Sequence, residues 1–276
     1  MHFPHPVLLL AICLLAAEPN LPADIPPDMQ AKFDALNSAG HWQVALTDPG
    51  SADWREHWFL DGEKAKVTNT PTGMELRAGE TPGEDAGHMV LWTRQEFVGE
   101  VRARFKFTRL DESKKFVNIL YLKATGTGEG GYEEDIAKWS DLRKVSSMKT
   151  YYERMKLWHL SFAAFGGAGP VADYIRARRY PTEGRDDFKR FDQETVVPPD
   201  YEPGGLFATG VEHRMTAIQA GNDLFLYVTN GTEKKLCHWD LAKWPPLDHG
   251  RIGLRLMASR AARIADFEVA TRPIEP

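Results

Sequence analysis

The sequence predicts an all-β domain, either a sandwich or a barrel, built from many short strands. Apolar and polar residues alternate with a period of two in segments spread from residue 74 to residue 269. Turn signals such as Gly221-Asn222 and Asn230-Gly231 separate these segments, and little of the chain has helical spacing. With 276 residues, 42% of them hydrophobic, the chain can bury the core of one large domain.

The chain is expected to begin with a secretory signal peptide at residues 1–17. The apolar run at 7–17 is too short to span a membrane and ends in small residues. The protein is therefore expected to be secreted or periplasmic. A lipid anchor at Cys13 is a weaker alternative, because the bulky Ile12 stands where such sites need a small residue. After cleavage Cys237 is the only cysteine, so no intrachain disulfide is expected.

Residues 18–49 are interpreted as a linker and N-terminal segment, with Pro-rich sequence up to residue 30 and a short helix at 29–39. The main domain is expected at 50–272. It opens with the aromatic-rich stretch 53–62, which ends in the turn signal Asp61-Gly62.

The first half of the domain contains one clearly alternating strand, at 100–108. Its apolar and basic side chains point to opposite faces: Ala103, Phe105 and Phe107 against Arg102, Arg104 and Lys106. The apolar face predicts a core contact. Further strands are expected at 74–77, 88–92, 116–123, 158–165 and 173–179. Helical turns are expected at 133–144, around Trp139.

In the second half, residues 181–203 are polar and contain several prolines, which predicts a long surface loop. The strands then resume at 213–219, 224–229, 235–239, 250–256 and 263–269.

Charge indicates which partners to expect. The net charge of -5 and a pI near 6.0 argue against a nucleic-acid partner. Between Arg143 and Arg190, however, eleven basic residues face only five acidic ones. This locally basic segment alternates Tyr, His and Arg in strand-like runs, and we expect it to line a groove for an acidic or polyhydroxylated ligand.

Three parts of the chain together resemble the YesU-like bacterial family, a family of domains of unknown function. They are residues 88–92 with 101–107, residues 151–152 leading to 159–162, and the closing segments 250–257 and 265–269. The resemblance covers about 50–272 and implies a concanavalin A-like jelly roll of two antiparallel sheets with one concave face. The long polar stretch 181–203 departs from the usual pattern of the family.

The resemblance also implies a carbohydrate-related function. Relatives occur among bacterial genes for degrading complex polysaccharides, and the superfamily includes lectins, glycosidases and polysaccharide lyases. We therefore expect a secreted protein that engages an acidic polysaccharide or oligosaccharide on the concave sheet. A β-eliminating lyase is the most concrete form of this hypothesis, and a non-catalytic lectin-like protein is the alternative.

The strand at 158–165 offers a candidate base. His159 shares a face with Leu157 and Ser161, whereas Trp158, Leu160 and Phe162 form the other, core-facing side. A neutral imidazole on the concave side can accept a proton near neutral pH. A histidine held by a neighbouring hydroxyl group is the alternative.

The next expected strand places Tyr174, Arg176 and Arg178 on one face. Guanidinium groups suit a uronate carboxylate, whose neutralisation lets a base remove the adjacent proton while a tyrosine protonates the leaving oxygen. A solvated edge with ion pairs to Asp173 or Glu153 is the alternative. The candidate catalytic residues are His159, Tyr152, Tyr174 and Arg176. The candidate substrate-binding residues are Arg178, Lys149, Arg154, Trp139 and Glu134.

A glycosidase of the jelly-roll type is disfavoured. Such enzymes place carboxylates in the pattern Glu-x-Asp-x-x-Glu, but here the register gives Glu133, Asp135 and Lys138. Glu133 and Glu134 are better interpreted as the start of a helix. No cofactor is expected from any motif. A structural calcium held by loop carbonyls and an aspartate stays open.

Overall fold

The computed structural model describes residues 25–38, 40–166, 173–182 and 193–273. The signal peptide expected at 1–17 lies outside these residues, as does most of the linker that follows it.

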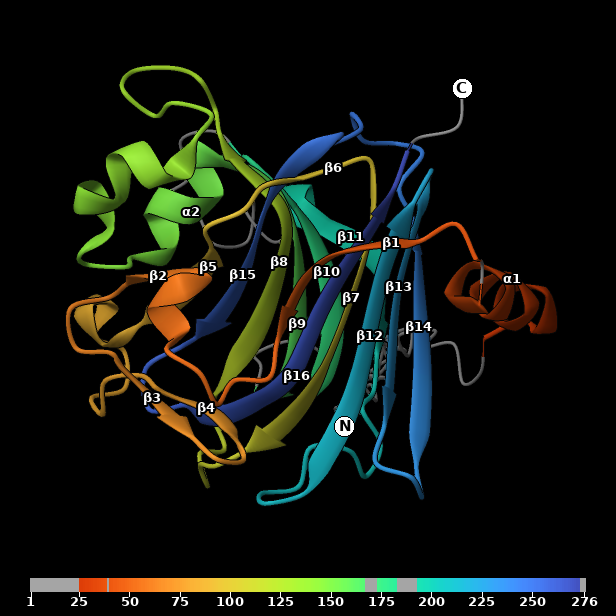
Figure 1. Cartoon of the computed structure of the whole chain (residues 1–276), viewed down its shortest axis with the longest axis horizontal. Coiled ribbons are helices and arrows are strands. Elements are labelled where there is room, and N and C mark those ends of the chain that lie inside the picture. Colours follow the sequence, from red (N-terminus) through yellow and green to blue (C-terminus); the bar gives the residue numbers. More distant parts are fainter. Residues whose placement is uncertain (1–24, 39, 167–172, 183–192, 274–276) are drawn as a thin grey trace, which may run out of the picture.

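Two antiparallel sheets pack face to face as a sandwich (Figure 1). Sheet A contains, in spatial order, β14 (Lys234–Asp240), β13 (Asp223–Thr229), β12 (Glu212–Ala220), β7 (Glu100–Arg109), β16 (Ala261–Arg272), β4 (Gly73–Arg77) and β3 (Lys66–Thr70), with β1 (Gln43–Asp48) also paired to β16. Sheet B contains β11 (Val196–Tyr201), β10 (Tyr174–Tyr180), β9 (Met155–Phe165), β8 (Phe116–Gly126), β15 (His249–Leu256), β5 (Met89–Thr93) and β2 (Trp58–Asp61), with β6 (Phe97–Val98) also paired to β15.

The core between the sheets follows the period of two in the sequence. In β7, Ala103, Phe105 and Phe107 are buried in the core, as the alternation predicts. In β9, Trp158 and Leu160 occupy the core, so the neighbouring His159 points to the outer face of sheet B. Fully burying one phenylalanine contributes about 1.5–3 kcal/mol, so a one-residue register slip in either strand would be costly.

The outer face of each sheet is partly covered by a helix. On sheet A, α1 (Pro27–Ser38) packs Phe33 against Phe225 and Tyr227, and Figure 1 shows it beside β13 and β14. On sheet B, the 3-10 turns η3 (Ile136–Arg143) and the helix α2 (Met148–Arg154) cover a second apolar cluster. The outer face of sheet B is therefore closed over β5, β8 and β15.

Two short 3-10 turns complete the connections, η1 (Trp54–Glu56) and η2 (Asp85–Gly87).

The structure corrects three expectations. Residues 149–154 belong to α2 rather than to a strand-like run, because Tyr151 on that helix packs onto sheet B. Part of the loop expected at 181–203 is the edge strand β11, where prolines are tolerated because one side needs no ladder hydrogen bonds. The segment expected to precede the domain at 18–49 contributes β1 to sheet A.

Candidate functional site

The outer face of sheet B carries most of the polar side chains that the sequence singles out. Strand register sets Arg178 beside His159 and His159 beside Tyr121, and the outer face continues to Arg255 on β15. We call this set the polar face: Arg176, Arg178, Tyr180, His159, Ser161, Tyr121 and Arg255. Sheet B is thus apolar toward sheet A, and on its other side these polar side chains lie next to the apolar cluster that η3 and α2 cover.

His159 is at the centre of the polar face, but it is not open to solvent. The ring is 3% exposed. Its Nδ1 lies 2.8 Å from Oη of Tyr180, and its Nε2 lies 2.6 Å from Oγ of Ser161. Burial holds the pKa of His159 well below its ordinary value, and the positive charges of Arg178 and Arg255 lower the pKa further. The imidazole is therefore neutral, with one nitrogen donating and the other accepting.

Arg255 brings a buried positive charge beneath this face. Its side chain is fully buried, and Nη2 donates to the carbonyl of Ser146 at 2.7 Å. Among the described residues, its Nε and Nη1 donate no further hydrogen bond of good geometry, and the buried hydroxyl of Tyr121 lies beside this guanidinium group. Burial raises the pKa of Tyr121 to about 12, although the Arg255 charge opposes the rise. Within the described ranges no carboxylate forms an ion pair with Arg255, so this part of the face is electropositive.

Arg176 and Tyr174 lie at the half-buried end of the face, on β10. Nε of Arg176 donates to Oδ1 of Asp200 at 2.8 Å, and Nη2 donates to Oδ2 of the same carboxylate. The guanidinium also lies 4.4 Å from the ring centre of Tyr174. The ion-pair alternative considered for this arginine thus exists, with Asp200 rather than Asp173 or Glu153 as the partner.

Three further candidates lie on α2. The half-buried ring of Tyr152 packs edge-on against Tyr180, with ring centres 6.4 Å apart, which brings it beside the His159 cluster. Lys149 and Arg154 have exposed side chains, each 3.8 Å from a carboxylate oxygen of Glu153. Both cations therefore lie near the Glu153 carboxylate at the edge of the face.

The last two candidates do not join the polar face. Trp139 is 4% exposed, its Nε1 donates to the carbonyl of Glu133, and Arg143 covers its ring at 4.2 Å. Trp139, expected among the substrate-binding residues, therefore offers no open ring to a ligand, because the ring packs into the layer over sheet B. Glu134 is exposed on the loop before η3, where its neighbour Glu133 pairs with Lys138.

Sequence reasoning missed Tyr121, Tyr180 and Arg255. The signal for Tyr180 was present, because it continues the period-two series of Arg176 and Arg178. Tyr121 and Arg255 lie within largely apolar strands, where their cross-strand neighbours cannot be read from sequence.

No group of three or more His, Cys, Asp or Glu that could hold a metal ion occurs among the residues described. In the same part of the chain, no helix is long and apolar enough to cross a membrane.

No known family model matches the sequence, and no curated protein does either. The resemblance to the YesU-like family therefore has no support from a family model.

Solved structures do match. A protein of unknown function with a galectin-like fold from Bacillus subtilis is similar with a TM-score of 0.63 and 19% identity, covering 84% of this chain and 99% of that one. The carbohydrate recognition domain of Emp47p has a TM-score of 0.54 and 13% identity, over 85% and 99% of the two chains. The VIP36 exoplasmic/lumenal domain, in a form bound to Ca²⁺ and Man3GlcNAc, has a TM-score of 0.54 and 11% identity, over 84% and 92%. These similarities confirm the predicted fold, a lectin-like sandwich of two antiparallel sheets.

Proposed function

We propose that this protein binds an acidic carbohydrate at the half-buried end of the polar face of sheet B, in the manner of a lectin and without catalysis. The observation that carries the proposal is the buried positive charge of Arg255, which no described carboxylate balances, beneath a face of hydroxyl and guanidinium groups. Because Arg255 is fully buried, it does not touch the ligand and attracts it only through the electric field of its positive charge. The residues proposed to contact the ligand are the half-buried Tyr174, Arg176 and Tyr152.

Chemistry and fold both support a sugar. Tyrosine rings pack on the apolar C–H face of a pyranose, and their hydroxyl groups exchange hydrogen bonds with its hydroxyls. Two of the similar solved structures are a carbohydrate recognition domain and a domain bound to an oligosaccharide. The signal peptide expected at 1–17 predicts export, which would bring the protein to extracellular glycans. Finding a mature N-terminus near residue 18 in the secreted protein would support this.

A β-eliminating lyase is the second candidate. In its favour, a neutral His159 lies 2.8 Å from a tyrosine hydroxyl and beside Arg178, the three residue types that this reaction uses. Against it, both ring nitrogens of His159 are already engaged and the ring is 3% exposed. A general base must come within hydrogen-bond reach of the proton it removes, and this geometry gives a bound sugar no such access.

A glycan array followed by calorimetry on the best ligand tests the binding proposal. We expect uronate-containing or sulfated glycans to bind, and salt to weaken them because screening acts on exposed charges. Arg176→Gln is expected to weaken binding about tenfold, through the loss of one charge-assisted contact. Arg55→Gln is the control for losing one arginine charge elsewhere on the protein, since Arg55 is an exposed arginine on η1. Equal loss in both variants, or no acidic ligand at all, would refute the proposal.

The same preparation distinguishes the two candidates. Unsaturated uronates absorb in the ultraviolet, so incubation with acidic polysaccharides is followed by absorbance. A flat trace with intact binding supports the lectin-like function. A rise that disappears in His159→Gln would establish elimination instead.

A further inference from the structure

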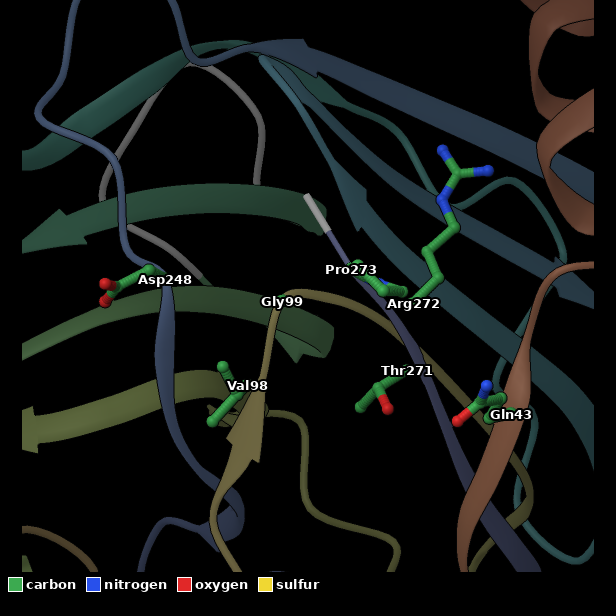
Figure 2. A pocket seen from close by; sticks show the side chains of 7 residues that line it. All are labelled: Gln43, Val98, Gly99, Asp248, Thr271, Arg272 and Pro273. Carbon is green, nitrogen blue, oxygen red and sulfur yellow. The ribbon is translucent and has the colours of Figure 1, made fainter. Parts of the chain in front are cut away.

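A cavity lies away from the polar face, at one end of the sandwich where the two sheets approach each other (Figure 2). Its volume is about 460 Å³, within the range of roughly 300–1,000 Å³ typical of small-ligand pockets. The cavity is lined by Gln43, Val98, Gly99, Asp248, Thr271, Arg272 and Pro273.

Strand pairing fixes both rims of this cavity. On the sheet A side, Gln43 of β1 and Thr271 of β16 are direct cross-strand partners. On the sheet B side, Val98 of β6 pairs with His249 of β15, and the amide of Gly99 donates to the carbonyl of Asp248 at 2.8 Å. The polar side chains are therefore presented from paired strands rather than from a free loop.

Gly99 forms the junction between the rims. Its φ of +85° favours glycine, and a Cβ there would lie 2.3 Å from the carbonyl oxygen of Arg272. Only a residue without a side chain lets the chain leaving β6 approach the end of β16 this closely. Gly99 thus keeps the two rims together.

The charges at the cavity do not suit an anion. Arg272 pairs with Glu100 and lies over the ring of Trp42, and Figure 2 shows its side chain directed away from the other lining groups. The exposed carboxylate of Asp248 accepts a hydrogen bond from His249, which lowers the pKa of Asp248 and keeps it ionised. The lining therefore offers one carboxylate, one amide and one hydroxyl group, with no unbalanced positive charge.

The apolar contribution comes from Val98, whose side chain is among the most exposed large hydrophobic groups in the described chain, at 70%. A single exposed valine is ordinary on a protein surface. Here it lies in a concavity together with Gln43, Thr271 and Asp248, which can exchange hydrogen bonds with neighbouring hydroxyl groups. A pyranose presents this combination, an apolar C–H face edged by hydroxyls.

We infer that this cavity is a binding site for an uncharged sugar, of the size of a mono- or disaccharide. The C–H face of the sugar packs on Val98, and its hydroxyls bond to Asp248, Gln43 and Thr271. The site does not depend on the acidic ligand proposed for the polar face, because no lining residue belongs to that face.

Ligand-observed saturation-transfer NMR with the methyl glycosides of glucose, galactose and mannose, on the full chain, tests this inference. We expect at least one glycoside to bind with a millimolar dissociation constant. Asp248→Ala and Val98→Asp are each expected to weaken it about tenfold or more, since one removes a charged acceptor and the other the apolar contact. Both residues are exposed, so the variants retain the fold.

Two matched controls accompany these variants. Asp141→Ala removes another exposed carboxylate, and Val145→Asp changes another exposed valine. Both are expected to bind the glycoside like the parent protein. Absence of saturation transfer from all three glycosides, or equal binding by Asp248→Ala and Asp141→Ala, would overturn the inference. Because Arg176→Gln leaves this cavity intact, failure here and failure of the acidic-glycan proposal can be told apart.

Discussion

Replacing Asp61 with alanine is expected to detach the layer that covers sheet B. Asp61 is 1% exposed, and its Oδ2 alone accepts three hydrogen bonds. They come from Nε of Arg143 at 2.6 Å, Nε1 of Trp92 at 2.7 Å and Oη of Tyr151 at 2.9 Å. One carboxylate oxygen therefore ties η3 and α2 to strands β2 and β5.

The magnitude follows from what the substitution leaves behind. Arg143 is fully buried, and removing one partner of a buried ion pair costs about 3–5 kcal/mol. The indole N–H of Trp92 and the hydroxyl of Tyr151 also lose their acceptor, at about 1–3 kcal/mol each where no water replaces it. Burial raises the pKa of Asp61, while the Arg143 charge opposes the rise, so the carboxylate depends on its cation. We expect Asp61→Ala to lose at least about 3 kcal/mol of unfolding free energy.

Urea unfolding followed by far- and near-ultraviolet circular dichroism measures this loss. The near-ultraviolet signal reports on the stacked rings of Trp92, Tyr121 and Tyr151, whose centres lie 5.4–6.3 Å apart. Adding Arg143→Met to Asp61→Ala is expected to recover part of the loss, because it removes the unpaired buried charge. A loss below about 1 kcal/mol, or a double variant no more stable than Asp61→Ala, would refute this account of the hydrogen bonds around Asp61.

Two further predictions concern the same sheet. Because the folded protein holds the pKa of His159 well below 6.5, the unfolded chain takes up a proton on acidification that the folded chain does not. The stability that depends on this group is therefore fully present above pH 6.5, and about 1.4 kcal/mol of it is lost per pH unit as the pH falls from there toward the lowered pKa of the folded state. His88, with its pKa lowered to about 4, acts in the same direction. We therefore expect His159→Gln to reduce the slope of stability against pH without abolishing it. Equal slopes for the variant and the parent protein would contradict the contribution assigned to His159. Gly253→Ala places a Cβ 2.5 Å from the ring of Trp92, so a loss of about 1–3 kcal/mol is expected in thermal unfolding, and an unchanged midpoint would contradict it.

Much of the sandwich can be predicted from sequence because burial on one face imposes a local pattern. The alternation in β7 and β9 identified which side chains enter the core, and the faces of Phe105 and Leu160 follow from it. Arg176 and Arg178 could be assigned to one face by the same rule. The strand's pairing partner need not be known for this assignment, because one face of the strand packs in the core between the sheets and the other does not.

Other features depended on contacts between distant segments. Tyr151 shows no strand or helix preference strong enough to decide its state, and its packing on Trp92 and Tyr121 makes the segment helical. The edge strand β11 forms because β10 offers it an unpaired side, although its own prolines suggest a loop.

The sequence by itself determined the fold class, the core-facing sides of the strands and the local excess of positive charge between Arg143 and Arg190, since each depends on residue types at short separation. Only the tertiary structure decided that His159 is enclosed between Tyr180 and Ser161, that Arg176 pairs with Asp200, and that Gln43 meets Thr271 at the edge of a cavity. In most of these cases the two residues are more than 20 positions apart in the chain, so their contact depends on how the strands are paired. The pattern of side chains alone does not specify that register.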